Sequence, residues 1–205
     1  MGIGNMNSLN NWHYEVLKEI GNIGVGHAIG ALEKLINKRV RMTVPEVKLL
    51  AFKDVGSILG GDEVVIFGIL VGISGDINGI MMFLIKPHAA RILVNGLMGT
   101  NEKGEEFSEM CRSALEEIGN ILCSSYLMAL SALINKSVIP APPTLAMDMA
   151  TAILSVPAIE FGKMADGVLF IDTMFETDGE NSSGYFLLVP DFESFGVILT
   201  ALGVM

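Results

Sequence analysis

Hydrophobic positions along the chain follow two spacings, which predict where its helices and strands lie. Residues 12–37 and 108–135 carry apolar residues three and four apart, as in long amphipathic helices. Shorter apolar runs bounded by glycine, proline and polar clusters indicate strands. We predict strands within 38–52, 63–73, 78–86, 156–162, 167–177 and 184–190, and further helices at 87–98, 144–154 and 192–202. The expected fold class is therefore α+β.

The two long helices each open one copy of a sequence repeat. At a constant offset (117 − 19 = 98), 13 of the 27 positions from 19 to 45 are identical to those from 117 to 143. Self-similarity of this kind indicates an internal duplication. We expect a single domain, 1–205, made of two pseudo-symmetric repeats at about 11–99 and 108–205. The two halves would share a β-sheet and leave both long helices exposed.

The stretch LKEIGNIGVGHAIGAL at 17–32 resembles a glycine-rich phosphate loop at first sight. A dinucleotide loop, however, follows a strand and has regular glycine spacing, and this stretch has neither property. Only Gly21 has a counterpart in the second repeat, at Gly119. A glycine inside a helix costs about 1 kcal/mol relative to alanine. Its presence at both positions indicates either a close approach of a partner to the helix or tight helix packing.

Composition and charge exclude several classes of function. The chain has 205 residues, 51% of them hydrophobic, and a net charge of −10. Nucleic acid requires a basic face, so we expect no nucleic-acid partner. The mean hydropathy of +0.53 draws attention to the apolar segment 64–85. Asp76 and Asn78 interrupt that segment, so we interpret it as two buried strands joined by a turn and expect no membrane insertion.

The cysteines and histidines show no pattern of a disulfide framework or a metal site. Cys111 and Cys123 lie twelve residues apart on one predicted helix, about 18 Å at the rise of an α-helix, which is too far for a disulfide. Unpaired cysteines without a signal peptide are typical of a reduced, cytoplasmic protein. The three histidines, at 13, 27 and 88, lack ligand spacing, so we expect no structural zinc.

One narrow polar stripe runs along each long helix. Positions spaced 0, 4, 7 and 11 span about 60° of a helix circumference. In the second helix these positions are Ser113, Glu117, Asn120 and Ser124, and in the first they are Glu15, Glu19, Asn22 and Gly26. A solvated helix face would have the same residue types. Both copies, however, keep one glutamate and one asparagine three residues apart.

The chemistry of a glutamate and an asparagine alone is limited. The carboxamide can hold and orient a water molecule, and the carboxylate can pair with a lysine. No nucleophile, metal cluster or arginine lies beside them in the sequence. An enzyme of this kind therefore needs a substrate that brings its own metal and positive charge. A phosphorylated protein with bound Mg²⁺ meets this requirement.

At this point the sequence resembles the CheC/CheX/FliY phosphatases of chemotaxis. Their signature is an Asp or Ser, three residues, Glu, two residues and Asn on one helix. Ser113, Glu117 and Asn120 match it fully; in the first repeat Glu19 and Asn22 match, but Glu15 occupies the Asp/Ser position. The paired motifs are similar to CheC, since CheX carries one motif and dimerises.

The resemblance implies a substrate and a division of roles. The substrate would be the phosphorylated response regulator CheY, whose own site holds Mg²⁺, and the phosphatase would need no cofactor of its own. Asn22 and Asn120 would align a water for in-line attack on the acyl phosphate. Glu19 and Glu117 would pair with the conserved lysine of the regulator.

A second implied partner is the receptor deamidase CheD. The segment TLAMDMATAIL at 144–154 resembles the helix by which CheC binds CheD, with Asp148 as the contact. An ordinary amphipathic helix with a solvated aspartate would look the same. The alternative function is therefore a non-catalytic adaptor that binds CheD or the flagellar switch.

Overall fold

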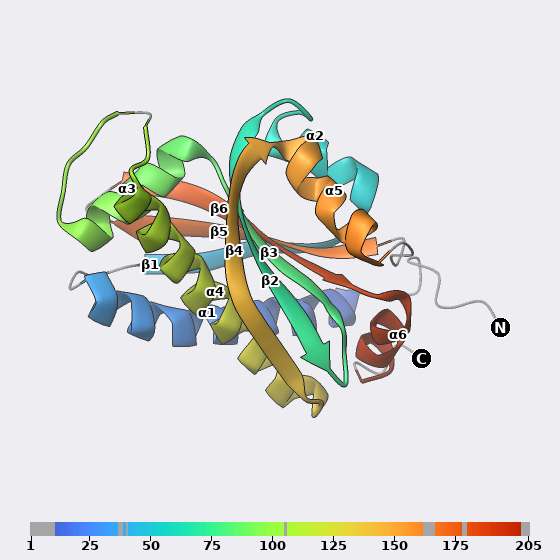
Figure 1. Ribbon diagram of the computed structural model, residues 1–205. Helices are drawn as coiled ribbons and strands as arrows, with labels where there is room; N and C mark the ends of the chain where they lie inside the picture. Colours follow the sequence, from blue (N-terminus) through green and yellow to red (C-terminus); the bar gives the residue numbers. More distant parts are fainter. Residues whose placement is uncertain are drawn as a thin grey trace.

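A computed structural model describes residues 11–36, 39, 41–104, 106–161, 167–177 and 180–201. These residues form six α-helices and one six-stranded antiparallel sheet, so the fold is α+β (Figure 1). The elements in chain order are α1 (Asn11–Ile36), β1 (Arg41–Ala51), the short 3-10 helix η2 (Phe52–Asp54), α2 (Val55–Leu59), β2 (Val65–Gly75), β3 (Gly79–Ile85), α3 (Pro87–Met98), α4 (Glu109–Ile134), β4 (Val138–Met149), α5 (Ala150–Phe161), β5 (Gly167–Thr177), β6 (Glu180–Pro190) and α6 (Phe192–Ala201).

The strand order of the sheet is β1-β5-β6-β3-β2-β4, and every neighbouring pair is antiparallel. Apart from η2, the element order α-β-α-β-β-α occurs twice, as α1 to α3 and as α4 to α6. The corresponding strands are β1 and β4, β2 and β5, and β3 and β6. When each strand is exchanged for its counterpart, the strand order is the same when counted from the opposite edge of the sheet. The central pair, β3 and β6, joins the two halves, and β1 and β4 are the two edges.

Helices cover both faces of this sheet and divide the core in two. On one face, α1, α3 and α4 pack over alternate strand residues such as Phe67, Ile69 and Phe83. On the other face, α2 and α5 pack over the intervening strand residues, such as Ile66 and Met82. Figure 1 shows α1 and α4 together on one side of the sheet and α2 and α5 on the other. The candidate residues of the two long helices therefore lie on one side.

Several predicted boundaries are confirmed, together with the local chemistry that sets them. Pro87 opens α3 at its first turn, and Gly99 ends it in the left-handed conformation (φ 65°). The Ser108 side chain caps α4 by accepting a hydrogen bond from Cys111 N at 3.2 Å. The segment 64–85 contains the antiparallel strands β2 and β3, as the interrupted apolar pattern predicts.

The prediction of a helix at 144–154 and a strand at 156–162 is wrong. Residues 138–149 form the edge strand β4, and the helix α5 follows at Ala150–Phe161. The three prolines of this segment do not break the chain, because an edge strand tolerates residues that cannot donate to a second neighbour. The buried residues of α5, Ala150, Ile153, Leu154 and Pro157, are spaced 0, 3, 4 and 7, which is the helical period.

Two further elements differ from the prediction. The short helices η2 and α2 lie between β1 and β2, where we predicted none, so both halves insert a helix at this point. Strand β6 begins at Glu180, four residues before the predicted start. The connection between the predicted strands 167–177 and 184–190 includes residues 178–179, and the predicted last helix includes residue 202. These three residues lie outside the described part of the chain.

Helix α4 is long and apolar enough to cross a membrane by length and composition alone. However, 56% of its most apolar window is buried within the fold, as in the core helix of a folded domain. Its two cysteines, Cys111 and Cys123, are both free, as the helical spacing predicts, and both are buried. The hydropathy of α4 therefore reflects its role in the core beneath the candidate site.

Candidate functional site on helices α1 and α4

Helix α4 separates its polar stripe from its apolar face. Ser113 and Glu117 are exposed and Asn120 is half-buried. The opposite side is buried against the sheet and the other helices, through Leu115, Ile118, Leu122, Leu127 and Leu130. This arrangement places the whole signature of the second repeat at the surface of a rigid core helix.

Helix α1 presents the corresponding residues in the same way. Glu15, Glu19 and Asn22 are all exposed. Val25, Ala28 and Leu32, further along the helix, are buried in the same core that α4 enters. Both Glu/Asn pairs are therefore accessible to a macromolecular partner.

The two glycines shared by the repeats have a packing role. A Cβ added at Gly119 would lie 2.7, 2.7 and 2.8 Å from three side-chain atoms of Ile69 on β2. One added at Gly21 would lie 3.2 Å from Val44 on β1. Of the two explanations left open by the sequence, tight packing of helix on sheet therefore accounts for both positions.

The contact between the two long helices depends on a third glycine. A Cβ at Gly24 would lie 2.9 Å from Cα of Tyr126 on α4, so only a glycine permits this approach. The Tyr126 ring is buried and stacks on Phe186 of β6, with ring centroids 6.1 Å apart. Burial raises the pKa of Tyr126 above its usual range. The crossing of α1 and α4 thus fixes how the two polar stripes are held relative to the sheet.

The polar contacts of the two stripes differ. Ser124 Oγ donates a hydrogen bond to Asn120 Oδ1 at 3.4 Å. The Asn22 side chain makes no hydrogen bond within the described part of the chain. Four positions after Asn22, where α4 has Ser124, α1 has Gly26. Among the described residues, no hydrogen bond or ion pair joins Glu19 or Asn22 to the pair on α4. The structure therefore contains two separate Glu/Asn pairs.

The sequence predicts that Asp148 lies on a helix, but in the structure it lies on a strand. It is exposed on the edge strand β4, and its Oδ1 accepts a hydrogen bond from Met149 N at 2.7 Å. Asp148 pairs with Ile66, a residue of the core beneath α2 and α5. Because paired residues point to the same sheet face, Asp148 lies on the face opposite α1 and α4.

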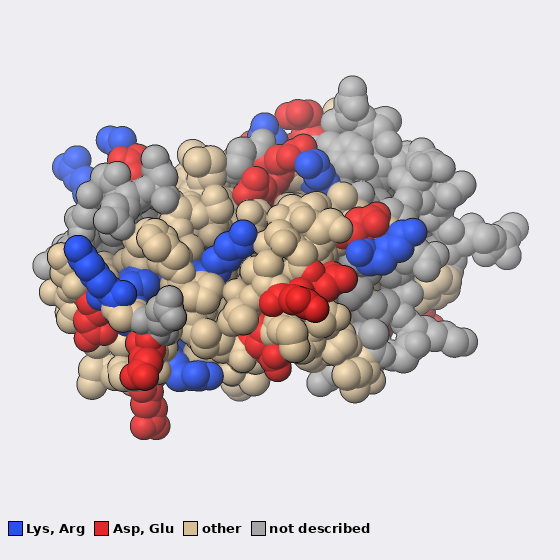
Figure 2. All heavy atoms as spheres, turned by 90° about the horizontal axis from the view of Figure 1, so that it is seen from above, with Lys and Arg blue, Asp and Glu red and all other residues tan. Residues whose placement is uncertain are grey.

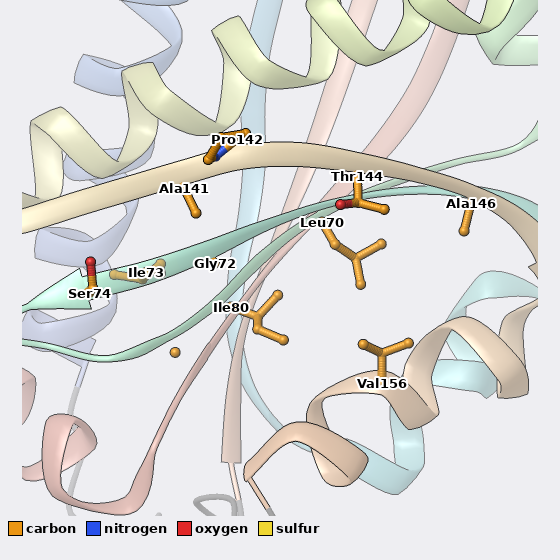
Figure 3. Close-up of a pocket in the computed structure, with 11 residues that line it drawn as sticks. Leu70, Gly72, Ile73, Ser74, Ile80, Ala141, Pro142, Thr144, Ala146 and Val156 are labelled. Atoms are coloured by element: carbon orange, nitrogen blue, oxygen red, sulfur yellow. The ribbon is translucent and has the colours of Figure 1, made fainter.

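A separate pocket of about 480 Å³ lies between strands β2 to β4 and helix α5. Figure 3 shows Leu70, Ile80 and Val156 pointing into it, and its polar side chains are the hydroxyls of Ser74 and Thr144. Its lining residues include no titratable side chain, so it offers no acid–base chemistry. Within the described residues, no group of three or more His, Cys, Asp or Glu side chains could hold a metal ion.

The charged surface shows no feature of a nucleic-acid interface in the view of Figure 2. Acidic and basic side chains are interspersed there between uncharged areas, over the molecule seen from above. A continuous basic stripe, which nucleic acid would require, is not seen among the described residues of this face. The Glu/Asn pairs of α1 and α4, exposed except for the half-buried Asn120, are the candidate functional site.

Comparison with known proteins identifies the segments that this chain shares with a known family. The model of the CheC-like family matches residues 15–49 and 110–147, which contain both Glu/Asn pairs but end before Asp148. Among solved structures, FliY of Thermotoga maritima has a TM-score of 0.76 at 20% identity, covering 95% of this chain and 98% of that one. A chain of the CheX–CheY–BeF3–Mg²⁺ complex of Borrelia burgdorferi has a TM-score of 0.50 at 17% identity, covering 82% of this chain and 96% of that one.

A curated relative extends over nearly the full chain. The CheY-P phosphatase CheC of Bacillus subtilis (strain 168) is 31% identical over 204 residues, which cover 96% of this chain and 97% of the relative. The FliY and CheX matches, at lower identity, show the shared fold. With 31% identity over 96% of its length to this relative, the chain belongs to the CheC family.

Proposed function

We propose that this protein is a phosphatase that hydrolyses the aspartyl phosphate of the chemotaxis response regulator CheY. The observation that carries the proposal is the pair of Glu/Asn motifs on two core helices, with Glu19, Asn22 and Glu117 exposed and Asn120 half-buried. Both motifs lie within the segments matched by the family model. The similarity to a CheY-P phosphatase over 96% of the chain supports it.

The proposed chemistry requires little from this chain beyond positioning. The amide of Asn22 or Asn120 holds a water in line with the phosphorus–oxygen bond of the acyl phosphate. The water oxygen bonds to phosphorus, the bond to the aspartyl oxygen breaks, and inorganic phosphate and the free carboxylate result. A proton of the water leaves with the phosphate or passes to solvent. Mg²⁺ bound in the regulator's own site would supply charge neutralisation at the phosphoryl oxygens.

Glu19 and Glu117 have a different proposed role. Each lies one helical turn before its asparagine and is exposed, so it can reach a lysine of the partner. Such a pair would anchor the regulator and orient the helix towards its active site. The CheX–CheY–BeF3–Mg²⁺ complex of Borrelia burgdorferi, which contains a fold relative of this chain, supports a phosphorylated regulator as the bound form, since BeF3 stands in for the phosphoryl group.

The test is phosphate release from phosphorylated regulator with and without this protein. Asn22→Ala and Asn120→Ala should each lower kcat with KM nearly unchanged, because the amide acts mainly in the transition state. The double variant should fall to the regulator's own dephosphorylation rate. We expect Asn120→Ala to cost at least as much as Asn22→Ala, since only the second motif is complete.

The glutamates provide an internal control. Glu117→Ala should mainly raise KM, whereas Glu116→Ala, at the neighbouring position outside the stripe, should change neither constant. A double asparagine variant that still accelerates phosphate release at the normal rate would end this proposal. Equal effects of the Glu116 and Glu117 substitutions would contradict the role of the glutamate.

We also propose that the chain is one domain formed by internal duplication, with repeats at about 11–99 and 108–205. The element order that occurs twice and the sheet order that reads alike from both edges support this. In this arrangement each repeat contributes one long helix with one exposed motif to the same side of the molecule.

Binding of CheD through Asp148 is the finer part of the proposal. Its support is the resemblance of 144–154 together with the exposure of Asp148 just before the start of α5. Asp148→Lys should weaken binding of CheD and leave phosphate release unchanged, because Asp148 lies on the sheet face opposite α1 and α4. CheD binding that survives this substitution unaltered would exclude the contact. A purely adaptor function would be supported by CheD binding without any phosphate release.

A further inference from the structure

We infer that Ser124 is a positioning residue for the second site and that the first site lacks this support. The inference rests on the proposed function, because it concerns the amide that would align the water. Its basis is the hydrogen bond from Ser124 Oγ to Asn120 Oδ1, at 3.4 Å, between residues one helical turn apart. Asn22 has Gly26 at the corresponding position, which has no side chain.

The contact restrains the part of Asn120 that would perform the chemistry. An exposed asparagine rotates freely about its terminal torsion, which is broad and has no single preferred value. A hydroxyl on the next turn of the same helix restrains the orientation of the amide through one long contact of 3.4 Å. The carbonyl oxygen has a second lone pair, so it can still accept a hydrogen bond from the attacking water.

Burial strengthens this difference between the sites. Asn120 and Ser124 are both half-buried, so the contact is partly protected from competing water, whereas Asn22 is exposed. Correct orientation of the water is required only in the transition state. The loss of the restraint should therefore lower kcat and leave KM unchanged, unlike the loss of a docking contact.

The first site offers a reciprocal experiment. A Cβ added at Gly26 would meet no atom within 4 Å, so the position has room for the first carbon of a side chain. Gly26→Ser adds the hydroxyl on the turn after Asn22, and Gly26→Ala adds only the carbon. The pair separates an effect of the hydroxyl from the stiffening that any side chain gives to a helical glycine.

Each site is measured with the other silenced. In the Asn22→Ala protein, Ser124→Ala should lower kcat about three- to tenfold, the value of one modest hydrogen bond, with KM within about twofold. Ser124→Thr, which keeps the hydroxyl, should restore most of the rate. Ser125→Ala, at the adjacent position outside the stripe, should change nothing. In the Asn120→Ala protein, Gly26→Ser should raise kcat above Gly26→Ala.

The outcomes separate this inference from the proposed function. Unchanged kcat in Ser124→Ala, or equal kcat in Gly26→Ser and Gly26→Ala, would overturn the positioning role while the asparagine variants still establish phosphatase chemistry. Activity that persists in the Asn22→Ala, Asn120→Ala double variant would instead refute the proposed function, whatever Ser124 does.

Discussion

Gly119 lies between the two proposed site residues of α4, and its replacement by alanine tests whether close packing explains its presence. The added Cβ would lie 2.7 Å from Cγ1 and Cγ2 and 2.8 Å from Cβ of Ile69. Ile69 is fully buried on β2. Its Cβ is attached directly to the backbone, so no side-chain rotation can move that atom away. Helix α4 or strand β2 must shift instead.

Two opposing effects set the magnitude. Alanine gains about 1 kcal/mol over glycine inside a helix. Overpacking of a rigid core costs about 1–3 kcal/mol, and this site belongs at the upper end because the obstructing atom cannot rotate. We expect Gly119→Ala to destabilise the fold by about 2 kcal/mol net. Gly30→Ala, where the new Cβ meets no atom within 4 Å, should instead stabilise it by up to about 1 kcal/mol.

Urea denaturation provides the measurement. With a slope of about 2–3 kcal/mol per molar, Gly119→Ala should lower the midpoint by roughly 0.7–1 M at an unchanged slope, and Gly30→Ala should raise it. A shift of α4 would also move Asn120, so the rate of phosphate release should fall more than stability alone explains. A Gly119→Ala protein as stable as Gly30→Ala would refute the packing explanation.

Two further predictions concern charges away from the site. Arg91 is buried, its Nη1 lies 3.0 Å from Glu102 Oε2, and its guanidinium carbon lies 3.9 Å from the Phe107 ring centroid. Because both contacts are lost, Arg91→Met should lower the free energy of unfolding by about 2 kcal/mol in the same urea assay. Burial, then the charge of Glu46, raises the pKa of Asp172 above its usual value, so protonation of Asp172 is more favourable in the folded state than in the unfolded chain. The stability that this protonation contributes is lost as pH rises through the folded pKa. Asp172→Asn should therefore raise the urea midpoint at about pH 7 and have little effect below about pH 3.8, and a constant difference across this range would contradict the assignment.

Local chemistry made some elements predictable and left others hidden. Pro87 with Gly99, and Ser108 with the helix that follows it, give unambiguous boundaries because each acts on its own backbone. The sequence mispredicts segment 138–161 because its prolines are compatible with an edge strand only once the sheet order is known. Pro157 inside α5 likewise obscured a helical spacing of buried residues.

In the candidate site, too, some features follow from the local sequence and others depend on tertiary contacts. The stripe of Glu117 and Asn120 follows from helical geometry alone, and the structure places it at the surface. The reason for Gly119 depends on Ile69, fifty positions away in the chain (119 − 69 = 50), so no local pattern could distinguish packing from the approach of a partner. Tertiary contacts decide such questions, and the sequence supplies only the alternatives.

The two long helices differ at the positions that frame the Glu/Asn pair and share the pair itself. Glu15 occupies the position that corresponds to Ser113, about one turn before the shared glutamate. Gly26 occupies the position that corresponds to Ser124, about one turn after the shared asparagine. If the framing residues tune an amide that the pair already supplies, the two sites should share a mechanism and differ in rate. If they were essential, the first site would be inactive and Gly26→Ser alone would not restore it. The activity of the Asn120→Ala protein, which retains only the first site, therefore separates the residues that perform the reaction from those that adjust it.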